Sequence, residues 1–207
     1  MRRAIVDPEH PDAAGIAAAV DVLRAGGIVA FPTDTLYGLA VDPRSEEAIS
    51  RLFALKGRDA RPAVPLIAAD LDQAKLAGDF GPRERRLAAA LWPGAVSIVV
   101  PPWPGLARGV FGDQEAIAIR VPAHAAARRL AAAFGFCVTA TSANTSGQPP
   151  AVTADAVAVA LPDVDFLLDA GRAPGGPPST IVAFDRDGPV LVRAGAIPWD
   201  RVLKSLQ

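Results

Sequence analysis

An apolar strand that ends abruptly in a cluster of polar side chains is the feature that most constrains this chain. Residues 28–31, Ile-Val-Ala-Phe, have a buried-strand pattern, and Pro32 then has no N–H with which to extend the pairing. Polar groups at the carboxyl end of a buried strand are where open α/β sheets bind ligands. Gly38 allows a sharp turn or a close backbone approach to a ligand, although an ordinary strand with a surface turn is the alternative interpretation. The candidate ligand-binding side chains here are Thr33, Asp34, Thr35 and Tyr37.

Composition limits the classes of protein to which the chain can belong. Its 207 residues, 51% hydrophobic and 21% charged, suffice for one sizeable domain, and we expect a single domain over 1–207. No window approaches the roughly 20 apolar residues of a membrane span and no signal peptide is evident, so we expect a cytoplasmic protein without a membrane partner. A net charge of −1 gives no overall basic field that favours nucleic acid. One cysteine, Cys137, and two histidines exclude a Cys-rich or multi-His metal site, and we interpret Cys137 as a small core residue.

Helical and strand patterns intermix along the chain, which predicts an α/β protein with a mostly buried sheet. Neither a Gly-x-Gly-x-x-Gly motif nor a Walker-type loop follows a strand, so a nucleotide would have to be bound in another way. The expected helices, with Ser45 and Thr153 as N-caps of two of them, cover residues 12–25, 45–55, 83–91, 123–134, 153–160 and 199–206. The expected strands cover residues 28–31, 65–68, 95–100, 116–121, 136–140, 165–169, 179–184 and 189–193.

Further polar segments follow other expected elements. Lys56 and Arg58 flank a glycine and can converge on one polyanion such as a triphosphate, although a solvated basic loop is the alternative. Residues 139–146 hold five hydroxyls and one amide, which suit an anion or an adenine edge, or else form a Ser/Asn turn. Single polar residues also lie at the ends of other expected strands. Such a residue either faces a pocket or forms a surface ion pair. These residues are Arg120, Ser179, Thr180 and Arg193.

The order and spacing of these segments resemble the YrdC-like threonylcarbamoyl-AMP synthase family. The match runs from about Ala13 to Ile197 and is typical of the single-domain form, which lacks the extra C-terminal domain of longer members. The resemblance implies a twisted open mixed α/β sheet with helices and a deep concave basic face. It is carried by seven motifs in register, F-P-T-D-T-L-Y-G-L, K-G-R, W-P-G, I-R-V-P, T-S-A-N-x-S-G, S-T-I-V and L-V-R-x-G-A-I.

Members of this family condense L-threonine, bicarbonate and ATP to threonylcarbamoyl-AMP and pyrophosphate, so the resemblance implies these substrates, with Mg²⁺ carried by ATP. A separate transferase complex, the implied downstream partner, then uses the adenylate to make threonylcarbamoyladenosine in tRNA. The implied threonine-binding residues are Thr33, Thr35, Tyr37, Arg120 and Ser179. The implied ATP-binding residues are Lys56, Arg58, Ala140, Ser142, Asn144 and Arg193. Such a reaction mainly needs positioning and charge neutralisation, so we assign no catalytic acid–base residue and no protein metal ligand.

Three positions depart from the family pattern and either reduce activity or mark a paralogue. Some relatives have a histidine where this chain has Ala68-Ala69, and others have a hydroxyl residue at Ala116 or a serine near Pro150. One alternative function is a non-enzymatic module that binds RNA or the ribosome with the same face, but strong RNA binders usually carry a basic excess. Another is carbamoyl-adenylate chemistry on a different acceptor, as in hydrogenase-maturation proteins, whose chains are normally much longer.

Overall fold

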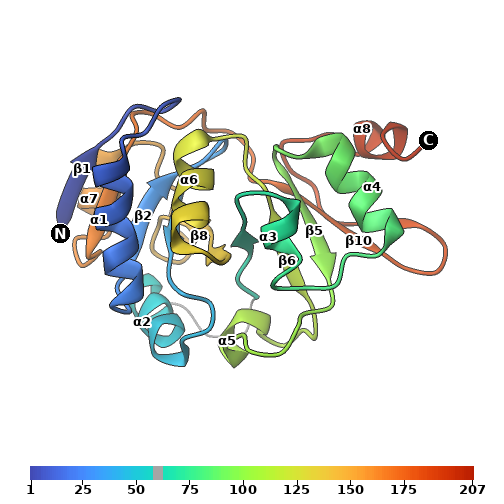
Figure 1. Cartoon of the computed structure of the whole chain (residues 1–207). Coiled ribbons are helices and arrows are strands. Elements are labelled where there is room, and N and C mark those ends of the chain that lie inside the picture. The colour runs from blue at the N-terminus through green and yellow to red at the C-terminus, as the bar shows by residue number, and fades with distance from the viewer. Residues whose placement is uncertain (58–62) are drawn as a thin grey trace.

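The computed structural model describes residues 1–57 and 63–207, and its strands form two open mixed sheets (Figure 1). The first sheet has, in spatial order, β1 (Arg2–Ile5), β9 (Phe166–Asp169), β2 (Val29–Pro32), β3 (Tyr37–Ala40) and β8 (Thr141–Ser142). The second has β11 (Pro189–Arg193), β10 (Thr180–Phe184), β5 (Val96–Val100), β6 (Ile117–Arg120), β4 (Leu66–Ile67) and β7 (Val138–Thr139). The predicted α/β class with open mixed pairing is confirmed, but with two sheets in place of one.

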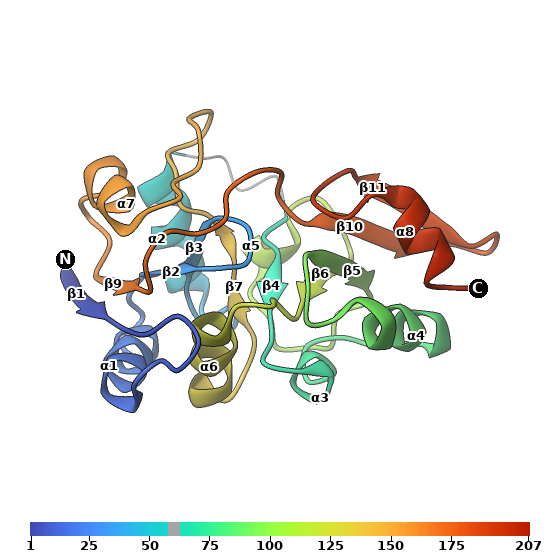
Figure 2. The same cartoon turned by 90° about the horizontal axis from the view of Figure 1, so that it is seen from above.

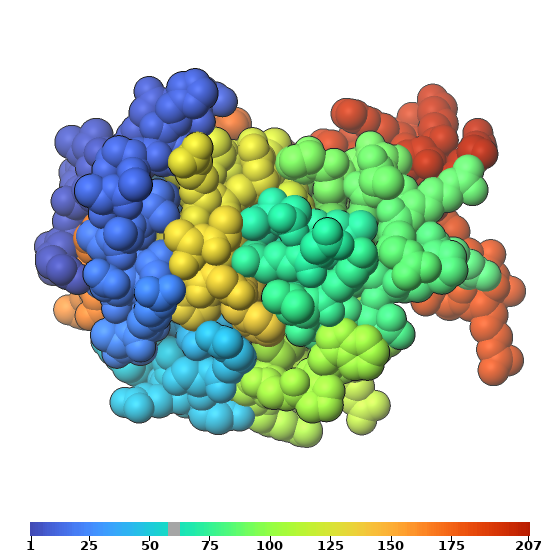
Figure 3. Space-filling model, viewed as in Figure 1, coloured from blue at the N-terminus to red at the C-terminus, as the bar shows by residue number. Residues whose placement is uncertain are grey.

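Helices cover the sheets, and α1, α6 and α3 lie side by side on one face of the molecule (Figure 3). The helices are α1 (Ala13–Arg24), α2 (Glu46–Lys56), α3 (Leu71–Ala74), α4 (Pro82–Leu91), α5 (Arg108–Phe111), α6 (Ala125–Phe134), α7 (Ala154–Ala160) and α8 (Trp199–Lys204). The predicted N-caps are confirmed, because the hydroxyls of Ser45 and Thr153 accept hydrogen bonds from backbone N–H groups three residues on, at 3.1 and 3.2 Å. No helix among the described residues is long and apolar enough to cross a membrane.

The described strands change sheet at three places along the chain, between β3 and β4, between β7 and β8, and between β9 and β10. The second change takes a single residue, Ala140, whose N–H donates to the Pro65 carbonyl at 2.8 Å. The predicted strand over 136–140 is therefore wrong at its end, because Thr141 pairs with Leu39 in the other sheet. Seen from above, the two sheets lie toward opposite ends of the molecule, as do the two termini (Figure 2).

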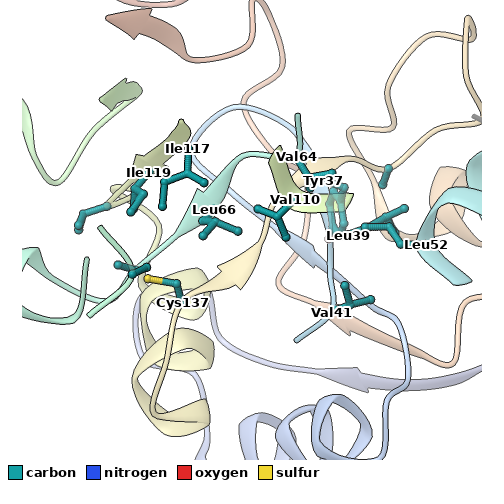
Figure 4. Packing of buried hydrophobic residues seen from close by; sticks show 14 of the residues in the cluster. Tyr37, Leu39, Val41, Leu52, Val64, Leu66, Val110, Ile117, Ile119 and Cys137 are labelled. Carbon is teal, nitrogen blue, oxygen red and sulfur yellow. The ribbon is translucent and has the colours of Figure 1, made fainter. Parts of the chain in front are cut away.

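One apolar cluster contains side chains from both sheets (Figure 4). Tyr37 and Leu39 from β3, Leu66 from β4 and Ile119 from β6 are each 0% exposed within it. Burial of apolar surface on this scale is the main favourable term in folding, and here it joins the two sheets. A second cluster is formed mainly by α1, α6 and the strands β2 and β9 of the first sheet.

Five elements were not predicted from the sequence, β1, β3, β8, α3 and α5. The strand β1 is exposed along most of its length, and its parallel pairing with β9, more than 160 residues away, leaves no local pattern. The helices α3 and α5 have four residues each, too few for a helical period. Of the two roles expected for Gly38, the sharp turn is wrong, because Gly38 lies within β3, where a Cβ atom would stand 3.2 Å from the Phe31 ring.

Cys137 is a core residue, as predicted, and we expect it to be chemically inert in the folded protein. The side chain is 0% exposed, and burial raises the pKa of its thiol to about 12. A thiol reagent at pH 8 should react with Cys137 only after unfolding in urea, and Cys137→Ala should destabilise the fold by roughly 1–2 kcal/mol without loss of activity. Equal rates of labelling in the native and unfolded states would contradict this prediction.

Candidate functional site

A cavity of about 650 Å³ opens where the two sheets meet. Its walls come from the tip of the β2–β3 hairpin, from the crossing at residues 140–142, from the loop before β10 and from strands of both sheets. The charged side chains among its described lining residues are two arginines, with no carboxylate. The lining residues are Thr33, Thr35, Leu36, Tyr37, Gly38, Ala63, Pro65, Leu66, Ile67, Ser97, Arg120, Ala140, Thr141, Ser142, Pro150, Gly176, Pro178, Ser179, Ile181 and Arg193.

This cavity brings together most of the residues that the sequence singled out. All five predicted threonine-binding residues line it, as do Ala140, Ser142 and Arg193 from the predicted nucleotide set. Lys56 and Asn144 are not among its described lining residues, and Arg58 lies outside the described residues. Of the positions that depart from the family pattern, Pro150 lines the cavity.

The tip of the β2–β3 hairpin is held by its own hydroxyl groups. The Thr33 hydroxyl donates to the Leu36 carbonyl at 2.7 Å and accepts from the N–H groups of Thr35 and Leu36 at 3.1 and 3.2 Å. The hydroxyls of Thr33 and Thr35 are 3.0 Å apart, and both side chains are almost fully buried. A threonine whose hydroxyl binds the backbone of its neighbours stabilises the turn, so this tip holds the backbone on both sides of Asp34.

Asp34 forms an ion pair with Arg120, which lies at the end of β6. The Arg120 Nη1 atom lies 3.2 Å from Asp34 Oδ1, and the two side chains are 7% and 14% exposed. Burial lowers the pKa of Arg120, whereas the Asp34 charge acts in the opposite direction, and the guanidinium stays charged at neutral pH. His124, the residue before α6, is close enough for the Asp34 charge to oppose the lowering of its imidazole pKa by burial.

Two serines and an arginine form a hydrogen-bonded group in the part of the cavity wall that the second sheet provides. The hydroxyls of Ser97 and Ser179 are 2.9 Å apart, and Arg193 donates to the Ser179 carbonyl at 2.7 Å and to its hydroxyl at 3.2 Å. Partial burial lowers the pKa of Arg193, and the charge of Arg120 acts in the same direction. Two guanidinium groups that repel each other across one cavity favour a ligand with negative charge.

Lys56 organises the loop that follows β8. It ends α2, where Gly57 has a φ of +57° and so reverses the chain in the left-handed conformation that glycine adopts easily. Lys56 is buried, with 3% of its surface exposed. Its ammonium group donates hydrogen bonds to the carbonyls of Ser142 and Asn144, the latter at 2.8 Å. The Asn144 amide in turn donates to the Gln148 carbonyl at 2.7 Å, which closes the loop.

Tyr37 connects the cavity to a buried carboxylate behind it. Its hydroxyl donates to the Gly171 carbonyl at 2.6 Å and lies 3.3 Å from Asp169 Oδ1. Asp169 also accepts from the guanidinium of Arg3 at 2.6 Å and from the N–H of Gly171 at 2.9 Å. Burial alone would raise the pKa of Asp169, but these donors outweigh it and hold that pKa below its usual value. The Tyr37 hydroxyl is therefore committed to positioning the start of the loop that leads to Ser179.

Sequence reasoning assigned no role to three residues that the structure places in or behind the site, Ser97, His124 and Asp169. Ser97 is the one polar residue within a strand of apolar ones, and this buried polar position is a signal that could have been used. Asp34 was a candidate ligand-binding side chain, but its pairing with Arg120 was not predicted. Asp169 ends β9, but its partner Arg3 is 166 residues away, and no local pattern indicates that contact.

The described residues contain no group of three or more His, Cys, Asp or Glu side chains that could hold a metal ion. The carboxylate beside the cavity, Asp34, is already paired with Arg120. A divalent cation that arrives with a nucleotide would therefore be held mainly by phosphate oxygens and water, as is common for Mg²⁺.

Residues 21–195 match the model of the Sua5–YciO–YrdC family, whose description reads "Telomere recombination". The chain belongs to this family. Similar curated proteins include the threonylcarbamoyl-AMP synthase of Chromohalobacter salexigens, which is 41% identical over 169 residues, or 80% of this chain and 90% of the relative. The synthase of Xanthomonas campestris pv. campestris is 35% identical over 188 residues, or 89% of this chain and 98% of the relative. The synthase of Pyrococcus abyssi is 33% identical over 90% of this chain, which spans only 55% of that longer relative.

Solved structures of family members have the same architecture. The crystal structure of P. abyssi Sua5 complexed with L-threonine superposes with a TM-score of 0.92 at 31% identity, over 99% of this chain and 61% of that chain. Escherichia coli YciO superposes with a TM-score of 0.87 over 98% of this chain and 100% of that chain, but at 23% identity this likeness concerns the fold alone. The YrdC-like fold that the sequence predicted is therefore confirmed.

The carboxylate of Asp169 should make stability depend on pH in a defined direction. Its folded-state pKa is lowered, so its contribution is complete above the unfolded-state pKa of about 4 and disappears as the pH falls through the folded value. Asp169→Asn should therefore cost about 1–3 kcal/mol at pH 7 and progressively less below pH ~4. Urea denaturation of both proteins between pH 3 and pH 7 measures this, and a cost that stays constant over that range would contradict it.

Proposed function

We propose that this protein is a threonylcarbamoyl-AMP synthase that condenses L-threonine, bicarbonate and ATP, with release of pyrophosphate. One observation carries the proposal. One cavity at the junction of the two sheets is lined by the predicted threonine-binding residues together with Ala140 and Ser142, in a chain 41% identical to a synthase of that name. Two substrates that must react with each other need such a common space.

The threonine side of the cavity offers groups that match an amino acid. The guanidinium of Arg120 suits the α-carboxylate, because a planar fork of N–H donors binds a carboxylate in two places. The hydroxyls of Thr33, Thr35 and Ser179 are near enough to the cavity to contact the polar groups of the substrate. Tyr37 shapes this side with its ring, since its hydroxyl is bound to Gly171.

The crossing at residues 140–142 and the loop after it form the nucleotide side of the cavity. Ala140 and Ser142 line the cavity, and Asn144 keeps the loop in shape, so the nucleotide would lie along this segment. Lys56, Arg58 and Arg193 would neutralise the phosphates, with Mg²⁺ brought by ATP. Lys56 has this role in addition to its contacts with the carbonyls of Ser142 and Asn144, and the two roles together would couple phosphate binding to loop position.

The reaction needs positioned charge more than proton transfer. The threonine nitrogen first bonds to the carbon of bicarbonate, a C–O bond of bicarbonate breaks and water leaves. An oxygen of the resulting carbamate then attacks the α-phosphorus of ATP. The bond between the α-phosphorus and the bridging oxygen breaks, and pyrophosphate leaves with its electron pair. Cationic groups that stabilise charge on the phosphates during this transfer are the main catalytic requirement.

The product is a reactive mixed anhydride, so a separate acceptor enzyme must consume it. We propose the transferase complex that makes threonylcarbamoyladenosine in tRNA as that downstream partner, and the cytoplasm as the site of the reaction. The chain itself carries a net charge of −1, which provides little general attraction for RNA.

Pyrophosphate release with ATP and Mg²⁺, measured with and without L-threonine and bicarbonate, tests the proposal. We expect release that requires both, and a drop of about 100-fold in Lys56→Ala because a charge on the phosphates is lost. Lys75→Ala is the matched control, since Lys75 pairs with Asp72 on the surface at 2.9 Å, and it should retain full activity.

Two results would contradict the synthase. Bound ATP without threonine-dependent release would indicate a paralogue with another acceptor. Neither release nor ATP binding, combined with salt-sensitive binding of RNA, would indicate the RNA-binding alternative.

A further inference from the structure

Three buried side-chain atoms among the described residues lack a hydrogen-bond partner in the protein, and they are Asp34 Oδ1, Arg120 Nη1 and His124 Nδ1. They belong to one cluster, because Asp34 lies 3.2 Å from Arg120 and its charge acts on His124. Buried polar groups in native proteins are nearly always satisfied, so a group of exceptions at one place needs a functional explanation.

The ion pair between Asp34 and Arg120 differs from the other arginine–carboxylate pairs among the described residues. Arg44 donates to both carboxylate oxygens of Asp42, each at 2.9 Å, and Arg3 donates twice to Asp169. Arg120 and Asp34 are close enough for a salt bridge, but their atoms are not directed for a hydrogen bond. Within the described part of the chain, the Arg120 guanidinium makes no hydrogen bond at all.

Charge balance without hydrogen bonding has a specific consequence. A buried guanidinium with no counter-charge is costly, and it turns toward water or draws in another partner. A carboxylate that is hydrogen-bonded to it removes this cost but also occupies its donors. Asp34 supplies the negative charge and leaves the donors of Arg120 available to a ligand in the cavity that Arg120 lines.

We propose that Asp34 is a positioning residue for L-threonine, which holds the Arg120 guanidinium in the cavity by charge alone and leaves its N–H groups for the α-carboxylate. The inference rests on the proposed function. The hairpin tip that carries Asp34 has the rigidity this role requires, because the Thr33 hydroxyl fixes the turn on either side of the carboxylate. Arg120 is equally fixed, since its backbone lies in β6 and accepts a hydrogen bond from Ala68 at 2.9 Å.

The sign of the effect separates this role from simple competition. If Asp34 only competes with the substrate carboxylate for Arg120, its removal should tighten threonine binding. If Asp34 holds the guanidinium in place, its removal should weaken threonine binding and leave ATP binding unchanged.

Steady-state pyrophosphate release with varied L-threonine, and separately with varied ATP, distinguishes the two. For Asp34→Asn we expect the KM for L-threonine to rise by about tenfold or more, while kcat and the KM for ATP change by less than about threefold. Asp34→Glu should recover part of the loss. Adding Asp34→Asn to Arg120→Gln should change the KM by less than about twofold, because Asp34 acts through Arg120.

Asp42→Asn is the matched control, since it removes a carboxylate from an arginine outside the cavity and should leave both KM values as they are. An unchanged or lower KM for L-threonine in Asp34→Asn, an equal rise in both KM values, or full additivity with Arg120→Gln would overturn the inference. If Asp34→Asn does not fold, Asp34→Glu alone decides, with a rise of at least about threefold expected in the KM for L-threonine.

Calorimetry with L-threonine separates failure of this inference from failure of the synthase. Wild-type protein that binds L-threonine but releases no pyrophosphate would contradict the synthase alone, and the same variants would then be compared by their Kd for L-threonine. Wild-type protein that binds no L-threonine would overturn both.

Discussion

The crossing of the chain between two sheets at Ala140 is the constraint on which the rest of the structure depends. One residue takes the chain from β7 to β8, so the two sheets must approach closely there, and the Thr139 hydroxyl binds the backbone of both Leu39 and Val41 at this place. The hairpin tip at Thr33, the end of β6 at Arg120 and the loop before Ser179 all converge on this junction. The cavity is therefore a consequence of topology, and its chemistry comes from the residues that strand ends and crossings happen to place there.

Charge is concentrated in this cavity although the whole chain is nearly neutral. Arg120 and Arg193 lie close enough for one to lower the pKa of the other, and the described lining contains no carboxylate. The balancing negative charges lie behind the lining, with Asp34 beside Arg120 and Asp169 beneath Tyr37. An anionic substrate in the cavity therefore lies near fixed positive charges. The negative charges behind the lining offset the free energy that burial of these positive charges costs.

More of the candidate site than of the sheet topology could be predicted from the sequence. Local signals identified the polar residues, because hydroxyls and arginines at the ends of apolar runs are visible one segment at a time, and most of them line the cavity. The division into two sheets was not predictable, since it depends on the pairing of Thr141 with Leu39 about a hundred residues away. Asp169 was missed for the same reason, because its role depends on Arg3, which is distant in sequence.

We infer that L-threonine and ATP meet in the cavity between the two sheets. A crystal structure of the protein with L-threonine and a non-hydrolysable ATP analogue would test this inference. We expect both ligands in this cavity, with the threonine carboxylate on the Arg120 guanidinium and the nucleotide along residues 140–144. Ligands bound elsewhere, or a threonine carboxylate that does not contact Arg120, would contradict it.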